Sequence, residues 1–528
     1  MNRFQLDLSR VFGVVGLSLS VLGISQLAPL LVALALPERR GVALPLLLGA
    51  LTSLVPGIAI VRATRREHLR PPTRREALAG VALAWLAAVA SAATPYVASG
   101  GVSVVDALVE SASGLTTVGA TILPDVDAIP TELHLWRALT HWLGGAGIVL
   151  VVLVAVPWLT PDVKATQGAE ASFLTERYRG STKATVQGLM FVYVGATILN
   201  TILLVAFGLS PWEALLHAFA TISTGGFSTR TASMGAWGPG VQLVTVVFML
   251  IGALSFATLG RAVEDLRRRC EAAREGAGRF GAAAALLSEG PGAFWRALRS
   301  SPEVRGYLVM IALVSLGIAL ALSGGGAAQY EGVGGFAQAL VDSLFTVAAI
   351  STTTGFCTAD YTTWPVVTQV VLLGLMVVGG CSGSTAGGLK FRRLQILAKL
   401  VYREARRVAN PNAVIPLRVG GEQVPEEQIH EATRYLAVYV LIVFAVAAAV
   451  GLTGSDLVSS LAASVSSMGS IGPGFGDCGP SGSFAPYAKV AKLVLILAMI
   501  LGRLEVWSLL SVFLPSFWLR RSSPPRAK

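Results

Sequence analysis

Runs of apolar residues long enough to cross a lipid bilayer recur from one end of the chain to the other. A membrane-spanning helix needs about 20 consecutive, mostly apolar residues, and ten segments meet or approach that length. They lie at residues 11–36, 42–61, 77–98, 138–159, 186–207, 241–259, 307–322, 366–378 (continuing through a glycine-rich break to about 401), 435–452 and 490–514. The pattern predicts an all-α polytopic membrane protein with ten spans, which places both termini on one side of the membrane.

The composition and the distribution of charge support this prediction. Only 13% of the residues are charged and 53% are hydrophobic, which argues against a soluble enzyme. On a soluble protein, the net charge of +11 would suggest a nucleic-acid partner. Here 34 of the 41 lysines and arginines fall on the side that holds the termini, and the side rich in such residues is cytoplasmic. The basic excess therefore predicts cytoplasmic termini in a membrane lipid environment, and no nucleic-acid partner.

Four connections on the outer side share one pattern, and we call them repeat loops A to D. Each starts with a short, mildly apolar helical stretch, predicted to be too short to span, and then turns into hydroxyl residues and glycine. The loops are SGLTTVGATIL (residues 113–123), ISTGGFSTR (222–230), ISTTTGFCTAD (350–360) and GSIGPGFGD (469–477). Aligned on one glycine, they are separated by 107, 129 and 117 residues. Internal repetition of this kind indicates one structural unit used four times.

The aligned positions of the four loops are chemically alike. The aligned glycines are Gly119, Gly226, Gly355 and Gly472, and two residues before them stand Thr117, Thr224, Thr353 and Ser470. Near the expected outer end of each helical stretch stands an acid: Asp106, Glu213, Asp342 and, three residues further upstream in the fourth copy, Asp456. A carboxylate there suits the positive end of the helix dipole, which is a structural role.

Four such loops around one axis can form a cation site. Irregular backbone at membrane depth is tolerated only where it is buried in protein or lines a wet cavity. Glycine permits conformations that turn carbonyl groups inward, and a ring of carbonyl oxygens can replace the hydration shell of a cation. Thr117-Val118-Gly119 also matches the start of the potassium-filter signature T-V-G-Y-G. The predicted filter residues are Thr116, Thr117, Val118, Gly119, Ser223, Thr224, Gly225, Gly226, Thr352, Thr353, Thr354, Gly355, Ser470, Ile471 and Gly472.

Residues 379–388, which we call the small-residue loop, read GGCSGSTAGG inside an otherwise apolar span. Each interior glycine costs a helix about 1 kcal/mol, so the segment predicts a kink, a close helix contact or a flexible loop that breaks the span. Arg503 stands near the middle of the last span, where a charge costs at least about 2.5–3.5 kcal/mol and has to face protein or water. A position that lines a water-filled pore meets this requirement. The alternative is a structural ion pair, for which Glu505 is poorly placed on the same helix.

The four repeat loops, together with HWLGGAGI at residues 141–148, resemble the Trk/Ktr/HKT superfamily of potassium-translocating subunits. The resemblance covers roughly residues 77–514, and the two additional N-terminal spans look like the TrkH/TrkG branch. It implies a pseudo-fourfold, potassium-channel-like arrangement, with a gating loop at the small-residue loop and an arginine under the filter. Gly119 occupies the position where this superfamily has glycine for potassium and serine for sodium transport. The predicted gating residues are Gly379, Gly380, Cys381, Ser382, Gly383, Ser384, Thr385, Ala386, Gly387, Gly388, Lys390 and Arg503.

The resemblance also implies an organisation, a function and partners. We expect two transmembrane helices at 1–75, pore repeat A at 76–185, repeat B with a cytoplasmic connector at 186–305, repeat C with the gating loop at 306–433 and repeat D at 434–528. The implied protein is not an enzyme but the K+-selective subunit of a Trk-type uptake system in the bacterial inner membrane. K+ is its transported ion, and this chain binds no nucleotide. The implied partners are a second copy, forming a homodimer, and a cytosolic TrkA-type nucleotide-binding ring.

Other interpretations of the same residues stay open. A K+ symporter coupled to H+ or Na+ is the first, although no acid sits convincingly inside a span to relay protons. Gly380-Cys381-Ser382-Gly383 fits the G-x-S-G pattern of rhomboid-like intramembrane proteases, but a nucleophilic serine needs a base within reach, and no histidine is predicted beside Ser382. Residues 383–390 come near to a phosphate-binding P-loop, but the lysine is one place late and no soluble strand precedes it, so we expect no nucleotide binding by this chain.

Two further features are compatible with more than one structure. Cys357 and Cys478 follow loops C and D on the outer side, where two buried free thiols are favoured over a disulfide. The connector at residues 261–305 is long and rich in alanine, glycine and arginine. It predicts an amphipathic surface helix on anionic lipid, a docking surface or a disordered linker.

Overall fold

The computed structural model describes residues 6–35, 41–64, 73–159, 182–324, 330, 332–504 and 506–518. Up to the third repeat loop, the described elements are α1 (Leu8–Ala35), α2 (Ala43–Thr64), α3 (Arg74–Ala92), α4 (Thr94–Ala98), α5 (Val104–Leu115), α6 (Thr131–Leu159), α8 (Thr182–Ala206), α9 (Pro211–Ile222), η2 (Ser233–Ala236), α10 (Pro239–Ala253), α11 (Phe256–Ser300), α12 (Pro302–Gly324) and α13 (Gly332–Ser351). After it come η4 (Tyr361–Thr363), α14 (Val366–Leu375), α15 (Phe391–Ala409), β1 (Arg418–Val419), β2 (Glu422–Gln423), α16 (Glu426–Gly451), α17 (Leu457–Gly469), η5 (Gly476–Cys478), α18 (Lys489–Arg503), α19 (Val506–Val512) and α20 (Pro515–Trp518). The described chain is therefore helical apart from loops and one two-stranded antiparallel hairpin, as predicted.

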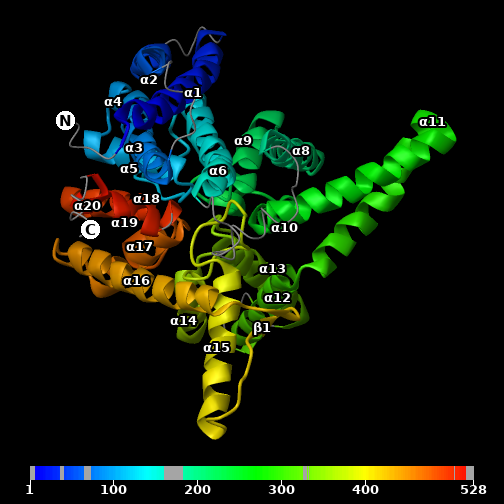
Figure 1. Cartoon of the computed structure of the whole chain (residues 1–528). Coiled ribbons are helices and arrows are strands. Elements are labelled where there is room, and N and C mark those ends of the chain that lie inside the picture. Colours follow the sequence, from blue (N-terminus) through cyan, green and yellow to red (C-terminus); the bar gives the residue numbers. More distant parts are fainter. Residues whose placement is uncertain are drawn as a thin grey trace, which may run out of the picture.

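The helices follow one another around a centre in chain order (Figure 1). α5 and α6 are succeeded by α8 to α10, then by α12 to α15, and finally by α16 to α18, which return to the side of α5. The N-terminal pair α1 and α2 packs outside this group, against α3. Small residues allow the close approach of this pair, since a methyl group built on Gly16 would lie 2.8 Å from the side chain of Ile60.

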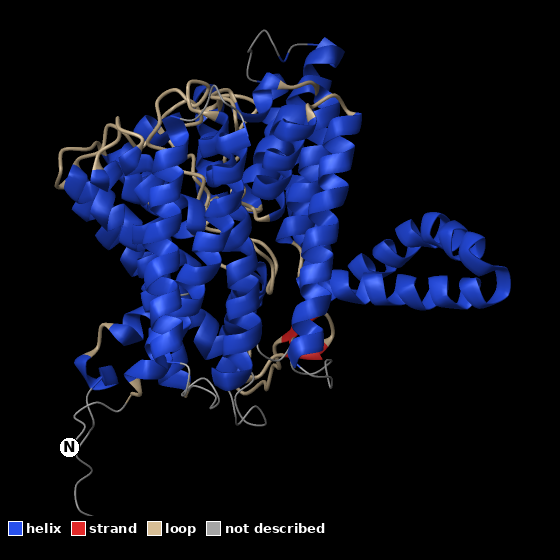
Figure 2. Ribbon diagram, turned by 90° about the horizontal axis from the view of Figure 1, so that it is seen from above, coloured by secondary structure: helices blue, strands red, loops and turns tan. Residues whose placement is uncertain are grey.

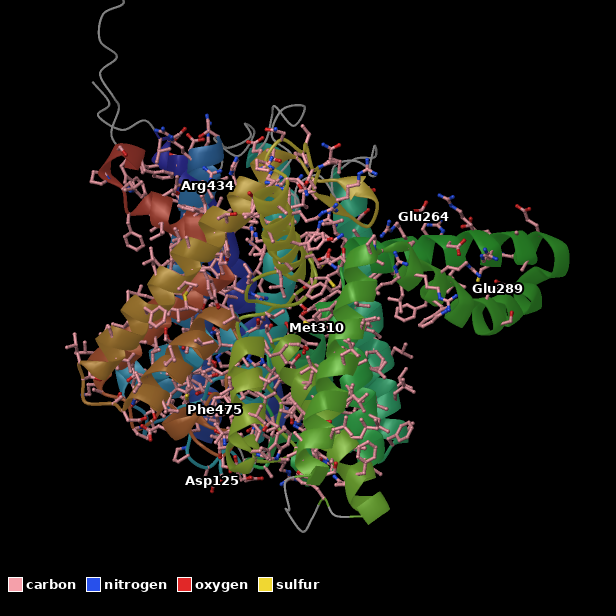
Figure 3. The ribbon with its side chains drawn as sticks, turned by 90° about the horizontal axis from the view of Figure 1, so that it is seen from below. Asp125, Glu264, Glu289, Met310, Arg434 and Phe475 are labelled. Carbon is pink, nitrogen blue, oxygen red and sulfur yellow. The ribbon has the colours of Figure 1, made fainter. Side chains whose placement is uncertain are left out.

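The two ends of the helical bundle differ in chemistry. Figure 3 places Asp125, which follows repeat loop A, and Phe475, which lies in repeat loop D, toward one end, and Arg434 at the other. The irregular loops gather at the first end, and the short β-hairpin lies at the second (Figure 2). Arg434 is one of the basic residues predicted to lie on the side of the termini, and it lies at the end away from the repeat loops.

Large apolar side chains are exposed along the outward faces of the long helices. Leu31, Val55, Phe191, Leu313 and Leu441 are each more than 60% exposed. Exposure on this scale is unusual for a soluble protein and is typical of a surface that faces hydrocarbon. Seven helices within the described residues are long and apolar enough to cross a membrane, and an eighth is added if the bent pair α10 and α11 counts as one span.

Two spans that we expected to be continuous are broken. The predicted span 241–259 ends at Ala253, and the chain resumes as α11 at an angle of 103°. The backbone carbonyls of Gly252 and Ala253 accept hydrogen bonds from the small-residue loop instead of continuing the helix. The predicted span 490–514 likewise ends as α18 at Arg503 and resumes as α19 at Val506. Glu505 lies outside the described residues.

The connector between repeats B and C is a helical projection. Its long helix α11 leaves the bundle and turns back on itself, as Figures 1 and 2 show. Ion pairs join its two arms, including Arg269 with Glu289 at 3.1 Å and Arg296 with Asp265 at 3.1 Å. The described connector thus forms a helical hairpin that projects from the bundle.

Candidate ion-permeation site

Four helices lead into the repeat loops, and three of them begin as the sequence predicts. Ser103 and Ser210 accept the backbone N–H groups of Asp106 and Glu213 in the first turns of α5 and α9. Asp456 caps α17 by accepting from the N–H groups of the second and third residues after it. Each cap satisfies amide groups that a helix start leaves unpaired.

The third helix departs from the prediction. α13 contains 20 residues and is long enough to qualify as a span, whereas α5, α9 and α17 contain 12, 12 and 13. Asp342 therefore lies in the middle of α13 rather than at its start. Its carboxylate accepts hydrogen bonds from the Tyr330 hydroxyl at 3.2 Å and from Gln338 at 3.0 Å, so its negative charge does not act at a helix terminus.

One or two residues beyond the end of each of the four helices stands a hydroxyl residue in the left-handed conformation. Their φ angles are 53° at Thr117, 53° at Thr224, 57° at Thr353 and 56° at Ser470. Ser233 is the fifth non-glycine residue with positive φ in the described chain. This conformation costs an L-residue roughly 1–2 kcal/mol, so its recurrence at four aligned positions reflects a shared requirement on the backbone.

The residue that follows each hydroxyl residue is bonded back to its own helix. Its backbone N–H donates to the carbonyl five residues earlier, at 2.9 Å for Val118, 2.8 Å for Gly225, 2.9 Å for Thr354 and 3.0 Å for Ile471. The aligned glycine comes next and is again left-handed, with φ between 75° and 97° in the four loops. The four loops therefore share one backbone course despite their different sequences.

The aligned glycines close the four loops into a ring. A methyl group built on Gly119 would lie 2.3 Å from the carbonyl oxygen of Gly225, and one on Gly226 would lie 1.9 Å from that of Thr354. The series continues from Gly355 to Ile471 at 1.7 Å and returns from Gly472 to Val118 at 2.5 Å. Each glycine thus faces a carbonyl of the next loop in the order A, B, C, D, A. This contact leaves no room for a side chain, which explains glycine at these positions.

The small-residue loop lies directly beneath this ring. The loop connects α14 to α15 and is not helical, as predicted. A hydrogen bond of 2.9 Å from the Gly379 amide to Leu389 O joins the two ends of the loop. Within the loop, the Gly387 amide donates to the Thr353 hydroxyl at 2.8 Å. The Thr385 hydroxyl donates to the carbonyls of Ile222 and Gly252. The loop therefore touches the ends of helices from repeats B and C at the level where the ring begins.

Arg503 joins the small-residue loop to repeats A and D. It is 3% exposed, and its guanidinium donates to Thr385 O at 2.6 Å and to Gly144 O at 3.4 Å. Lys390 also turns back to the loop, donating to Ala386 O at 2.6 Å. The sequence-predicted filter and gating residues are therefore brought together in one column, with the ring above and the loop with Arg503 below.

The TrkH family model, described as a cation transport protein, matches residues 51–519. This chain belongs to the TrkH family. The Trk system potassium uptake protein TrkH of Vibrio parahaemolyticus is 31% identical over 96% of this chain and 99% of that protein. TrkH of Escherichia coli is 31% identical over 84% of this chain and 86% of that protein. The crystal structure of the potassium transporter TrkH from Vibrio parahaemolyticus matches with a TM-score of 0.82 at 29% identity, covering 97% of this chain and 100% of that one. The resemblance to the TrkH/TrkG branch and the all-α fold class are confirmed.

Behind the ring of this TrkH-family chain lies a buried ion pair that the sequence analysis missed. Arg137 of α6 donates to Glu110 of α5 at 2.7 Å, and the two side chains are 2% and 0% exposed. The Glu110 carboxylate also accepts from the Ile122 amide at 3.0 Å, near the end of loop A. The Arg137 guanidinium lies 4.0 Å from the ring of Phe227, which stacks on His141. The pair therefore supports loops A and B from behind.

Breaking this pair should cost far more stability than breaking an exposed one. Arg137→Met leaves the Glu110 carboxylate buried without its cation, a change that typically costs about 3–5 kcal/mol. We expect a clearly lowered midpoint of thermal unfolding for the purified protein in detergent. Arg267→Met removes the 77% exposed partner of Glu271 and is the matched control, with no expected change. Equal midpoints for the two variants would contradict the supporting role.

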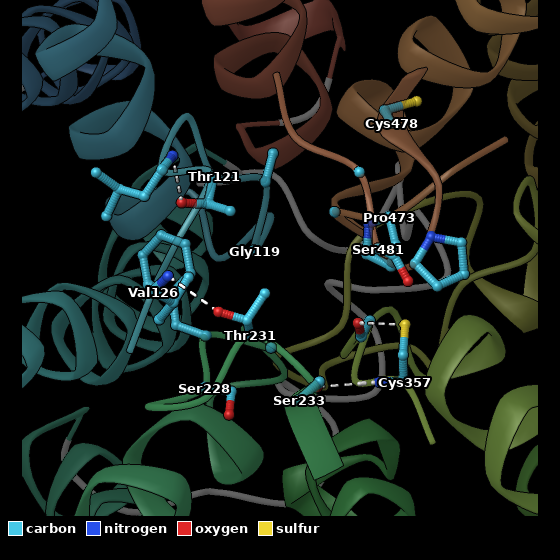
Figure 4. A pocket seen from close by; sticks show the side chains of 18 of the residues that line it. Gly119, Thr121, Val126, Ser228, Thr231, Ser233, Cys357, Pro473, Cys478 and Ser481 are labelled. Carbon is cyan, nitrogen blue, oxygen red and sulfur yellow. Dashed lines mark hydrogen bonds between the residues drawn. The ribbon is translucent and has the colours of Figure 1, made fainter. Parts of the chain in front are cut away.

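Above the ring is an open vestibule lined by the four aligned glycines and by the segments that follow them (Figure 4). Cys357 and Cys478 both border it and are free thiols, as favoured from the sequence. At its rim, hydrogen bonds from the Thr231 amide and hydroxyl, with Arg230 beside them, hold the pKa of Asp127 below its usual value. The Asp127 contacts also tie the outer segments of repeats A and B together.

Proposed function

We propose that this chain is the potassium-translocating subunit of a Trk-type uptake system. The observation that carries the proposal is the closed ring, in which the carbonyls of Val118, Gly225, Thr354 and Ile471 each face a glycine of the next loop. Carbonyl oxygens arranged in this way can replace the hydration shell of a cation. The Trk system names of relatives in Vibrio parahaemolyticus and Escherichia coli identify the cation as K+. K+ is then the transported substrate.

The small-residue loop and Arg503 act as the gate in this proposal. The loop occupies the path below the ring, and its contacts with Thr353 and Ile222 hold it there. Arg503 adds a buried positive charge at the same level, and a positive charge in a narrow path opposes the entry of a cation. Opening then requires the loop to leave its contacts beneath the ring.

Location and partners complete the proposal. The chain resides in the bacterial inner membrane with cytoplasmic termini, because its basic connections lie on the side of the termini. It assembles as a homodimer, and a cytosolic TrkA-type nucleotide-binding ring regulates it. Nucleotide is then bound by that partner and not by this chain.

Growth of a K+-uptake-deficient bacterium at low external K+ tests the proposal. Expression of this chain together with a TrkA-type partner should restore growth, whereas expression of an inactive variant inserted at the same level should not. Absence of rescue by a chain that is inserted in the membrane, with the partner present, would overturn the proposed function.

Gly119→Ser provides a test of ion selectivity at the ring. Gly119 has a φ of 81°, and a β-carbon there would lie 2.3 Å from Gly225 O. Serine therefore strains the backbone by about 1–2 kcal/mol and displaces loop A or loop B. We expect the ratio of K+ to Na+ permeability to fall roughly tenfold, as that strain implies, while the protein still inserts. The ratio is measured from reversal potentials, and an unchanged ratio would contradict the role of Gly119.

A further inference from the structure

The tip of the small-residue loop is held by residues at the two ends of the α11 hairpin. At the first end, the Phe256 amide donates to Gly383 O at 3.1 Å. Just beyond the second end, the Glu303 carboxylate in the first turn of α12 accepts from the Ser382 amide at 2.7 Å. Two consecutive residues of the loop are therefore contacted by the first residue of the hairpin and by a residue just after its last one.

The hairpin that connects these two contacts is braced along its length. Asp265 and Arg296 are 31 residues apart in the chain, a distance of roughly 46 Å along a straight helix. Their side chains nevertheless lie 3.1 Å apart, so the two arms run back beside each other. A second cross-link joins Arg269 to Glu289 at 3.1 Å. Figure 3 shows Glu264 and Glu289 on this projection, with Glu289 further from the bundle than Glu264.

Glu303 is placed where a carboxylate needs a partner. It is 6% exposed, and a buried carboxylate is costly unless hydrogen bonds compensate for its lost hydration. Glu303 lies in the first turn of α12, where the positive end of the helix dipole stabilises a carboxylate. The Ser382 amide supplies a hydrogen bond to a charged acceptor, which is stronger than one to a neutral oxygen. The carboxylate thus fixes one backbone atom of the loop.

The break between α10 and α11 holds the same part of the loop. The Cys381 amide donates to Ala253 O at 2.9 Å, and the Thr385 amide donates to Gly252 O at 3.3 Å. Those two carbonyls are left without helical partners because the chain bends by 103° after them. Movement of the hairpin about this bend would therefore disturb the contacts of Cys381, Gly383 and Thr385 together.

We infer that Glu303 is a positioning residue for the gate and that the α11 hairpin is a lever coupled to it. The inference rests on the proposed gating role of the small-residue loop. Displacing the hairpin moves the Phe256 amide and the Glu303 carboxylate, and these draw Gly383 and Ser382 with them. A protein bound to the hairpin would thereby shift the loop relative to the ring above it.

Hydrogen exchange of the full-length protein in detergent tests the role of Glu303, with mass-spectrometric detection of the peptide that contains the small-residue loop. Glu303→Ala removes the acceptor of the Ser382 amide, so exchange in this peptide should accelerate roughly tenfold or more. Glu303→Gln keeps an oxygen acceptor of similar reach and should restore most of the protection. Exchange in the peptide that contains Gly119 should match that of the unmodified protein for both variants.

Flux through proteoliposomes without any partner provides the second readout. Glu303→Ala should raise K+ flux at least about fivefold, because it removes the charge-assisted hydrogen bond that holds the Ser382 amide. The ratio of K+ to Na+ flux should not change. Unaltered exchange and flux, or equal behaviour of the alanine and glutamine variants, would overturn the role of Glu303. If Arg503→Ala raises flux while Glu303→Ala does not, this inference alone fails. If neither variant alters flux, the proposed gate itself fails.

Charge exchange across the hairpin tests the lever. Asp265→Arg places a third cation beside Arg269 and Arg296 and should separate the arms. Exchange in the small-residue loop should then accelerate, although the substituted residue lies on the projection. Adding Arg296→Asp restores an opposite-charge pair and should return exchange toward that of the unmodified protein. A loop that does not respond to Asp265→Arg would overturn the lever.

Discussion

Gly355→Ala is expected to eliminate K+ flux while leaving the protein folded and inserted. A methyl group at this position would lie 1.7 Å from Ile471 O and 2.8 Å from the Pro473 ring, and the backbone has a φ of 75°. Neither the carbonyl nor the proline ring can rotate away as a flexible side chain would. Loop C or loop D must therefore shift, which opens the ring. We expect a loss of flux of at least about 100-fold, equivalent to about 2.8 kcal/mol.

Gly374→Ala is the matched control for this variant. It lies on α14 in the same repeat, and a methyl group there would meet nothing within 4 Å. Flux through both variants is measured in proteoliposomes prepared with equal amounts of monodisperse protein. Substantial K+ flux through Gly355→Ala would show that the close approach of loops C and D is not needed for permeation.

Arg503→Ala is expected to raise K+ flux in the absence of a partner. The substitution removes a hydrogen bond of 2.6 Å to Thr385 O and a buried positive charge from the path below the ring. A hydrogen bond to a charged group contributes about 1.5–3 kcal/mol, which corresponds to a shift of roughly tenfold or more in the balance between loop positions. Selectivity should persist, because the ring is untouched.

Arg503→Lys separates the two contributions of this side chain. Lysine keeps the charge but carries one compact ammonium group and lacks the planar fork of arginine. It is therefore poorly suited to contact Thr385 O and Gly144 O together. We expect flux between that of the unmodified protein and that of Arg503→Ala. Flux through Arg503→Ala no higher than that of the unmodified protein would contradict the role of Arg503 in closing the path.

The ring was predictable from the sequence because its geometry restricts the residue types. A left-handed backbone and a carbonyl within 2.5 Å of the β-carbon position both require glycine at Gly119, Gly226, Gly355 and Gly472. The restriction recurs in four loops between apolar segments, so it appears as an internal repeat. The break at residues 379–388 was predictable for a related reason, since ten small residues in succession make a poor helix.

The contacts that support the ring and the loop were not predictable in the same way. Glu110 and Arg137 are 27 residues apart, and Glu303 and Ser382 are 79 apart, so neither pair leaves a local pattern. The bend after Ala253 also depends on residues distant in the sequence. Amides of the small-residue loop donate hydrogen bonds to the carbonyls that the bend leaves unpaired. Asp342 suggested the start of a helix, but α13 begins ten residues earlier, at Gly332. The apolar residues before Asp342 were the signal for this longer helix.

K+ flux through the purified chain in liposomes tests the central claim most directly. The account predicts K+ uptake driven by a K+ gradient alone, which a proton ionophore does not abolish and which is far faster than Na+ uptake under the same gradient. The Gly355→Ala variant, reconstituted in the same way in separate liposomes, should show no such K+ uptake. Equal K+ and Na+ flux, or K+ flux that requires a gradient of H+ or Na+, would contradict a ring of four loops that selects and conducts K+.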